Sequence, residues 1–110
     1  MGNQLIAPSI LSADFSDLKS DIFMVNDSEA DWFHIDIMDG VFVPNISFGM
    51  PVLKSINEYA TKTLDVHLMI VNPEKYIEKF AELGSNILTI HYEVSKDTLL
   101  DSIKEIKKYG

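Results

Sequence analysis

The sequence of 110 residues contains no cysteine and no arginine. The absence of cysteine excludes disulfide bonds and thiolate metal ligands. All nine basic residues are lysines, they are outnumbered by 17 acidic residues, and the net charge is −8. A chain this acidic, without arginine, is not expected to bind nucleic acid. Backbone N–H groups or a metal ion would have to hold any anionic ligand.

Long hydrophobic runs are also missing. No apolar stretch approaches the ~20 residues of a membrane-spanning helix. The N-terminus lacks the basic start and apolar core of a secretory signal. We therefore expect no membrane association and a cytoplasmic location. With 46% hydrophobic and 24% charged residues, the composition predicts one folded unit over residues 1–110 and no second domain.

Short apolar runs alternate with helix-like segments along the chain. Ser16 and Asn72 are predicted helix N-caps, and Gly84 is a predicted C-terminal stop. The order is βα repeated four times, which predicts a parallel sheet with right-handed crossovers. The predicted strands are 6–11, 32–38, 64–70 and 86–92, and the predicted helices are 16–25, 51–60, 72–83 and 95–109.

The repeat length suggests a larger architecture. Each unit takes about 27 residues, so eight units would need roughly 215, the size of a compact (β/α)₈ barrel. The predicted fold class is therefore α/β, as the first four βα units of a (β/α)₈ TIM barrel. A small open four-stranded sheet, complete in itself, fits the same pattern.

Three polar residues share one face of the two central predicted strands. Alternation of side chains places His34 and Asp36 together, and His67 follows on the next strand. Residues two apart on a strand are about 6.6 Å apart and adjacent strands about 4.8 Å, so all three can point at one divalent ion. This ligand set suits Zn, Fe or Mn. The alternative is a hydrogen-bonded His–Asp pair in a core without metal.

Further residues lie near the same strand ends, where barrel active sites are built. Ser9 lies on the first predicted strand. Met38 and Met69 follow Asp36 and His67 by two residues. The methionines either fill the core, the usual role of Met, or form an apolar lining over a reacting carbon.

Other polar residues in this region are assigned structural roles. We expect Asp65 to be a packed or capping residue rather than a ligand. His91 and Glu93 either reach the edge of the site or lie at an exposed strand end, and we expect the exposed strand end. The stretch 41–49 is long for a βα loop, and long loops over a site often carry function.

Three sequence blocks resemble the N-terminal half of the ribulose-phosphate 3-epimerase family. They occur in the family's order and spacing over essentially the whole chain. The resemblance implies a (β/α)₈ barrel that interconverts D-ribulose 5-phosphate and D-xylulose 5-phosphate, an isomerase of the pentose phosphate pathway in carbohydrate metabolism. The blocks are Ser9–Asp14, His34–Gly40 with Phe42–Asn45, and Asp65–Met69 with Asn72 and Pro73.

The resemblance also implies roles for individual residues. His34, Asp36 and His67 would hold a divalent metal, zinc or iron and in some cases manganese or cobalt, together with an aspartate from the later half. Asp36 would also be one of two catalytic acid/base groups. The implied substrate-binding residues are Ser9, His67, Met38 and Met69.

The chain departs from the family pattern mildly at Val41 and Tyr92. The family's second acid/base aspartate and its Gly-rich phosphate-binding loops belong to the last four units, so we expect little or no turnover from this chain alone.

Exposed strand edges predict a homo-oligomer or association with a C-terminal half. Two alternatives stay open: a 3-epimerase acting on a hexulose phosphate such as allulose 6-phosphate, and a non-catalytic half-barrel that binds metal or oligomerises.

Overall fold

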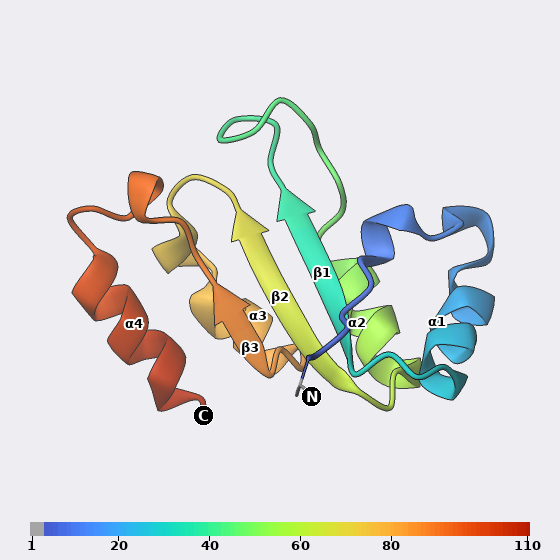
Figure 1. Ribbon diagram of the computed structural model, residues 1–110. Helices are drawn as coiled ribbons and strands as arrows, with labels where there is room; N and C mark the ends of the chain where they lie inside the picture. Colours follow the sequence, from blue (N-terminus) through green and yellow to red (C-terminus); the bar gives the residue numbers. More distant parts are fainter. Residues whose placement is uncertain (1–3) are drawn as a thin grey trace.

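The computed structural model describes residues 4–110 as an α/β fold in which three parallel strands alternate with helices (Figure 1). Strands β1 (Trp32–Met38), β2 (Thr63–Met69) and β3 (Ile87–Thr89) are hydrogen-bonded in that order. No helix within residues 4–110 is long and apolar enough to cross a membrane. Residues 1–3 of the predicted unit 1–110 lie outside the described residues. The helices are α1 (Leu18–Asp27), α2 (Met50–Tyr59), α3 (Ile77–Glu82) and α4 (Leu99–Lys108).

One face of the sheet carries the hydrophobic core. Burial alternates along β1, so Phe33, Ile35 and Ile37 are at most 5% exposed while the residues between them are half-buried. In Figure 1, α2 and α3 lie behind the sheet, and its other face turns toward the viewer. Burying one such side chain contributes about 1.5–3 kcal/mol, which fixes the face on which polar residues can lie. The core also includes Ile22, Val25, Leu53, Ile56, Leu64, Val66, Leu68 and Phe80.

The strand predicted at 6–11 is not a regular strand. The segment runs beside β1, where backbone N–H groups donate to the carbonyls of Ile6 and Pro8, and Ser9 makes a single parallel bridge to His34. A 3₁₀ turn follows at once, because the Ser9 hydroxyl accepts a hydrogen bond from the Leu11 N–H at 3.2 Å. Pro8 has no N–H to donate, so the pairing cannot continue as an ordinary ladder. The prediction of a regular strand at 6–11 is therefore wrong.

Three predicted helix starts also differ from the structure. Ser16 is no cap, because the Asp14 carboxylate accepts from the Ser16 N–H at 3.0 Å and begins a 3₁₀ turn before α1. Asn72 has a left-handed φ of 50° and makes no capping bond, and the predicted helix 72–83 divides into a 3₁₀ turn and α3. The predicted helix 95–109 begins later, as α4, and the Ser95 hydroxyl donates to the His91 carbonyl at 2.6 Å.

The C-terminal part of the fold is less completely packed. β3 is shorter than the predicted strand 86–92. α4 contacts α3, yet Ser102 is its only buried residue. Leu100 and Ile103, on the same helix, are exposed. This end of the described chain therefore offers an edge strand and apolar side chains that are not covered.

Candidate metal site

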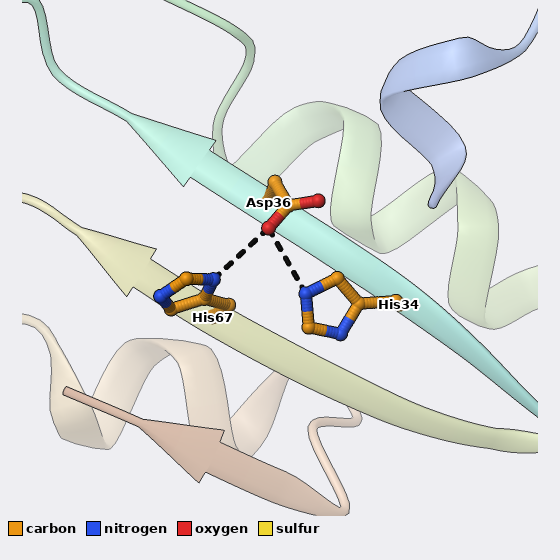
Figure 2. A group of neighbouring side chains, drawn as sticks. All are labelled: His34, Asp36 and His67. Atoms are coloured by element: carbon orange, nitrogen blue, oxygen red, sulfur yellow. Dashed lines mark hydrogen bonds and ion pairs between the residues drawn. The ribbon is translucent and has the colours of Figure 1, made fainter. Parts of the chain in front are cut away.

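β1 and β2 place three ligand-type side chains next to one another. In the parallel register Asp36 lies opposite His67, and His34 lies opposite Asp65. His34 and Asp36 are two residues apart on β1, so they extend to the same side of the sheet. Ligand atoms of His34, Asp36 and His67 all lie within 4.8 Å of one another. Figure 2 shows the Asp36 carboxylate between the two histidine rings. The geometry brings together all three predicted ligands.

The Asp36 carboxylate is at the centre of this cluster. Its Oδ1 lies 3.0 Å from His34 Nε2 and 3.0 Å from His67 Nδ1. Its Oδ2 accepts a hydrogen bond from the Ser9 hydroxyl at 2.6 Å. A tetrahedral ion with bonds of about 2.1 Å separates its ligand atoms by roughly 3.4 Å. The two distances to Asp36 Oδ1 are close to that value, and all three ligand atoms lie within 4.8 Å of one another, so the cluster is consistent with a divalent metal site.

The surroundings of Asp36 keep it ionised. Burial raises the pKa of Asp36, but the Ser9 hydrogen bond and the nearby His34 and His67 rings together lower it more, and the net pKa lies below its ordinary value. Asp36 is therefore a carboxylate at neutral pH. A metal ligand or a proton acceptor must be in this state.

The two carboxylate contacts of His34 indicate that a cation fits this cluster. His34 Nδ1 lies 2.9 Å from Asp65 Oδ2, and His34 Nε2 lies 3.0 Å from Asp36 Oδ1. Ionised carboxylates only accept hydrogen bonds, and a neutral imidazole has a single N–H. One of the two contacts therefore sets a nitrogen lone pair against a carboxylate oxygen. A positive charge resolves this conflict, either a second ring proton or a metal ion.

His67 contacts His91, for which the sequence left open a position at the edge of the site. Its Nε2 lies 2.7 Å from His91 Nε2, and the two rings stack with centroids 4.9 Å apart. Phe42, from the loop between β1 and α2, lies 4.8 Å from the His91 ring. The His91 side chain is 29% exposed, so the expectation of an exposed strand end is wrong for His91; Glu93, at 66%, is exposed as expected. Alternation placed His91 on the same strand face as Thr89, the register partner of His67, but β3 ends at Thr89 and His91 lies beyond the strand.

Met38 and Met69 are direct partners in the register at the carboxyl ends of β1 and β2. Met69 is 9% exposed and Met38 is half-buried. Their burial suits core filling, and their position on the strand face of Asp36 and His67 suits a lining of the site. Their contact with substrate stays a prediction.

The loop between β1 and α2 extends beyond the carboxyl ends of the strands (Figure 1). The Asp39 carboxylate accepts hydrogen bonds from the N–H groups of Val41 and Phe42 at 2.9 Å each, and from Val71 at 2.8 Å. Ser47 donates to the Asp36 carbonyl at 2.7 Å. These bonds tie the loop to the ends of both strands beside the cluster.

A family model and three similar known proteins carry the same description. The model of the Ribulose-phosphate 3 epimerase family matches residues 5–110. A ribulose-phosphate 3-epimerase of Synechocystis sp. is 55% identical over 91 residues, which cover 83% of this chain and 40% of that protein. One of Bacillus subtilis is 46% identical over 105 residues, covering 96% and 48%. The cytoplasmic isoform of Oryza sativa subsp. japonica is 45% identical over 105 residues, covering 96% and 46%. The chain spans about half the length of these curated relatives.

Proposed function

Because the chain belongs to the ribulose-phosphate 3-epimerase family, we propose that it forms the N-terminal half-barrel of a metal-dependent ribulose-phosphate 3-epimerase. The protein interconverts D-ribulose 5-phosphate and D-xylulose 5-phosphate in the pentose phosphate pathway, in the cytoplasm. The observation that supports this most strongly is the cluster of His34, Asp36 and His67 on one sheet face, with ligand atoms within 4.8 Å.

In this proposal the cluster holds a divalent metal through His34 Nε2, Asp36 Oδ1 and His67 Nδ1. Two imidazoles and a carboxylate suit zinc or iron, with manganese or cobalt as alternatives. When bound, the metal supplies Lewis-acid stabilisation of negative charge that develops on substrate oxygen. The resemblance implies a fourth ligand, an aspartate from the C-terminal half of the family's barrel.

Asp36 also acts as a catalytic acid/base group. Epimerisation next to a ketone removes the C3 proton from one face of the sugar and returns a proton to the other. The lowered pKa of Asp36 keeps its carboxylate free to accept a proton, and the Ser9 hydroxyl holds Oδ2 in place at 2.6 Å. A second carboxylate must act on the opposite face, because one group cannot easily reach both. The resemblance assigns this role to the aspartate of the C-terminal half.

The remaining proposed site residues contact the sugar phosphate. Ser9 and His67 are polar and lie against Asp36. Met38 and Met69 extend the same strand face toward the carboxyl ends of the strands. Polarisable sulfur side chains at this position would cover the reacting carbons and exclude water.

A partner half completes the protein in this proposal. The family's phosphate-binding loops and second aspartate lie in its last four βα units, so the chain alone turns over little or no substrate. The uncovered apolar side chains of Leu100 and Ile103, and the free edge of β3, suit association with such a half. A second copy of this chain is the alternative occupant.

Mixing the two halves tests the proposed function. The zinc-loaded chain is assayed for conversion of ribulose 5-phosphate to xylulose 5-phosphate alone, and then with the C-terminal half of the Bacillus subtilis relative. We expect turnover only in the mixture, loss of turnover with a chelator, and recovery when zinc is added back. An inactive mixture in which the two halves are shown to associate would contradict the proposal.

A further inference from the structure

We propose that Asp65 is a positioning residue that fixes the tautomer of His34 and so makes its Nε2 available to a metal. This inference rests on the proposed function, because it assumes that the cluster of His34, Asp36 and His67 binds metal. It assigns a task to a residue that the sequence suggested was only packed or capping.

The contact between Asp65 and His34 is built into the sheet. The two residues are direct partners in the register of β1 and β2, and Asp65 Oδ2 lies 2.9 Å from His34 Nδ1. The Asp65 side chain is 15% exposed and the His34 side chain 27% exposed, so water competes little for this bond. Both side chains extend from strands rather than loops, which keeps their relative position fixed.

The chemistry of Asp65 determines where the His34 proton lies. An ionised carboxylate only accepts hydrogen bonds, so His34 must carry its N–H on Nδ1 to bond with Asp65. The lone pair of the neutral ring then lies on Nε2, the ring nitrogen that is 3.0 Å from Asp36 Oδ1. That is the arrangement that a shared cation requires. Histidine ligands commonly donate their other N–H to a carboxylate in this way.

Without Asp65 the same two residues can satisfy each other. His34 would be free to carry its N–H on Nε2 and donate it to Asp36. The result is a closed His–Asp pair with no lone pair left for a metal at that nitrogen. Asp65 therefore decides between the two interpretations that the sequence left open, a metal site and a metal-free hydrogen-bonded pair.

The ring nitrogen of His67 that faces away from Asp36 has no carboxylate partner. His67 faces His91, and a neutral imidazole can be either donor or acceptor. His91 can adapt to either tautomer of His67, whereas Asp65 permits only one tautomer of neutral His34. We therefore expect the metal affinity to depend more on Asp65 than on His91.

Zinc affinity of the 110-residue chain tests the role of Asp65. The dissociation constant for Zn²⁺ is measured by chelator competition in the wild type, in Asp65→Leu, which removes the acceptor, and in Asp65→Asn, which keeps the shape. Asp27→Asn is the matched control, because Asp27 is an exposed residue at the end of α1. We expect Asp65→Leu to weaken binding roughly 10–100-fold, Asp65→Asn to weaken it less, and the control to leave it unchanged.

A second readout separates positioning from general structural damage. In the zinc-loaded wild type, NMR of the His34 ring should show a hydrogen-bonded proton on Nδ1, and the Leu variant should lack it. Equal zinc affinity in the wild type and the folded Asp65 variants would overturn the role of Asp65 while leaving the metal site intact. If Asp65→Leu fails to fold, the affinity of Asp65→Asn decides in the same way. A wild-type chain that binds no zinc would overturn both this inference and the proposed metal site.

Discussion

Asp36 connects three parts of the chain at the scale of single residues. Its Oδ1 lies between the rings of His34 on β1 and His67 on β2, and its Oδ2 holds the hydroxyl of Ser9 in the N-terminal segment. One carboxylate therefore fixes the relative positions of the side chains to which we assign metal binding and proton transfer.

Asp39 has a different task three positions further along. Burial raises the pKa of Asp39, but the N–H groups of Val71, Val41 and Phe42 lower it more, so the net pKa lies below its ordinary value. The ionised carboxylate thereby holds the loop between β1 and α2 against the end of β2.

The lowered pKa of Asp39 predicts a pH dependence. A carboxyl group with a depressed folded-state pKa stabilises the fold above its unfolded pKa of about 3.9, and this contribution is lost as pH falls through the folded value. We expect Asp39→Asn to melt at a lower temperature than the wild type at pH 7. The difference in melting temperature should shrink below about pH 4. Asp39 of the unfolded chain is protonated there first, and Asp39 of the folded chain follows at lower pH. Circular dichroism melts from pH 7 to pH 2 measure it, and a constant difference across that range would contradict the account.

The sequence could predict only those parts of the site that follow from the alternation of side chains along a single strand. Alternation placed His34, Asp36 and His67 on one face, and the structure brings them together. The contact of His34 with Asp65 depends on the register between two strands, which no pattern within one strand reveals. The contact of His67 with His91 depends on how the chain turns after β3.

At the scale of elements, the turn that follows α3 contains a glycine in a conformation that favours glycine. Gly84 has a φ of 106°, in the left-handed region that favours glycine. A Cβ at this position would lie 2.3 Å from Asn57 Oδ1, a side-chain atom of α2. A side chain at this position would therefore strain the backbone and require the Asn57 side chain to move.

Replacing Gly84 tests this close approach. We expect Gly84→Ala to lower the free energy of unfolding by about 1–3 kcal/mol, because the backbone strain remains even if Asn57 rotates away. Gly49→Ala is the matched control, since Gly49 has a φ of −141° and a Cβ there meets no atom within 4 Å. Urea unfolding measures both variants. Equal losses at the two positions would show that Gly84 is not conformationally required.

Hydrophobic periodicity predicted which helices and strands form better than it predicted where they begin and end. The apolar patterns identified β1, β2 and α2 almost to the residue. The first strand was wrong because the pattern ignored the missing N–H of Pro8 and the side-chain bond of Ser9. The cap at Asn72 was wrong: its backbone is left-handed, whereas capping residues usually have an extended backbone, and its side chain makes no capping bond. Ends depend on single hydrogen bonds, which hydrophobic periodicity does not record.

At the scale of the whole molecule, the two faces of the sheet have separate tasks. One face packs against α2 and α3 in the core, and the other carries the polar cluster (Figure 1). The predicted alternation of strands and helices is confirmed, and it forms an α/β fold with three parallel strands. Family membership implies that this is a fragment of a barrel. The closed barrel itself needs further strands, so it stays a prediction.

The most direct test of this account is the effect of Asp36→Asn on epimerisation of ribulose 5-phosphate by the mixed halves. We predict that the substitution lowers kcat by about 10²–10⁴-fold, because it removes both a proton-transferring carboxylate and a metal ligand. The control Asp27→Asn should retain wild-type turnover. An Asp36→Asn mixture that converts the substrate at the wild-type rate would contradict the claim that this carboxylate is part of the catalytic centre.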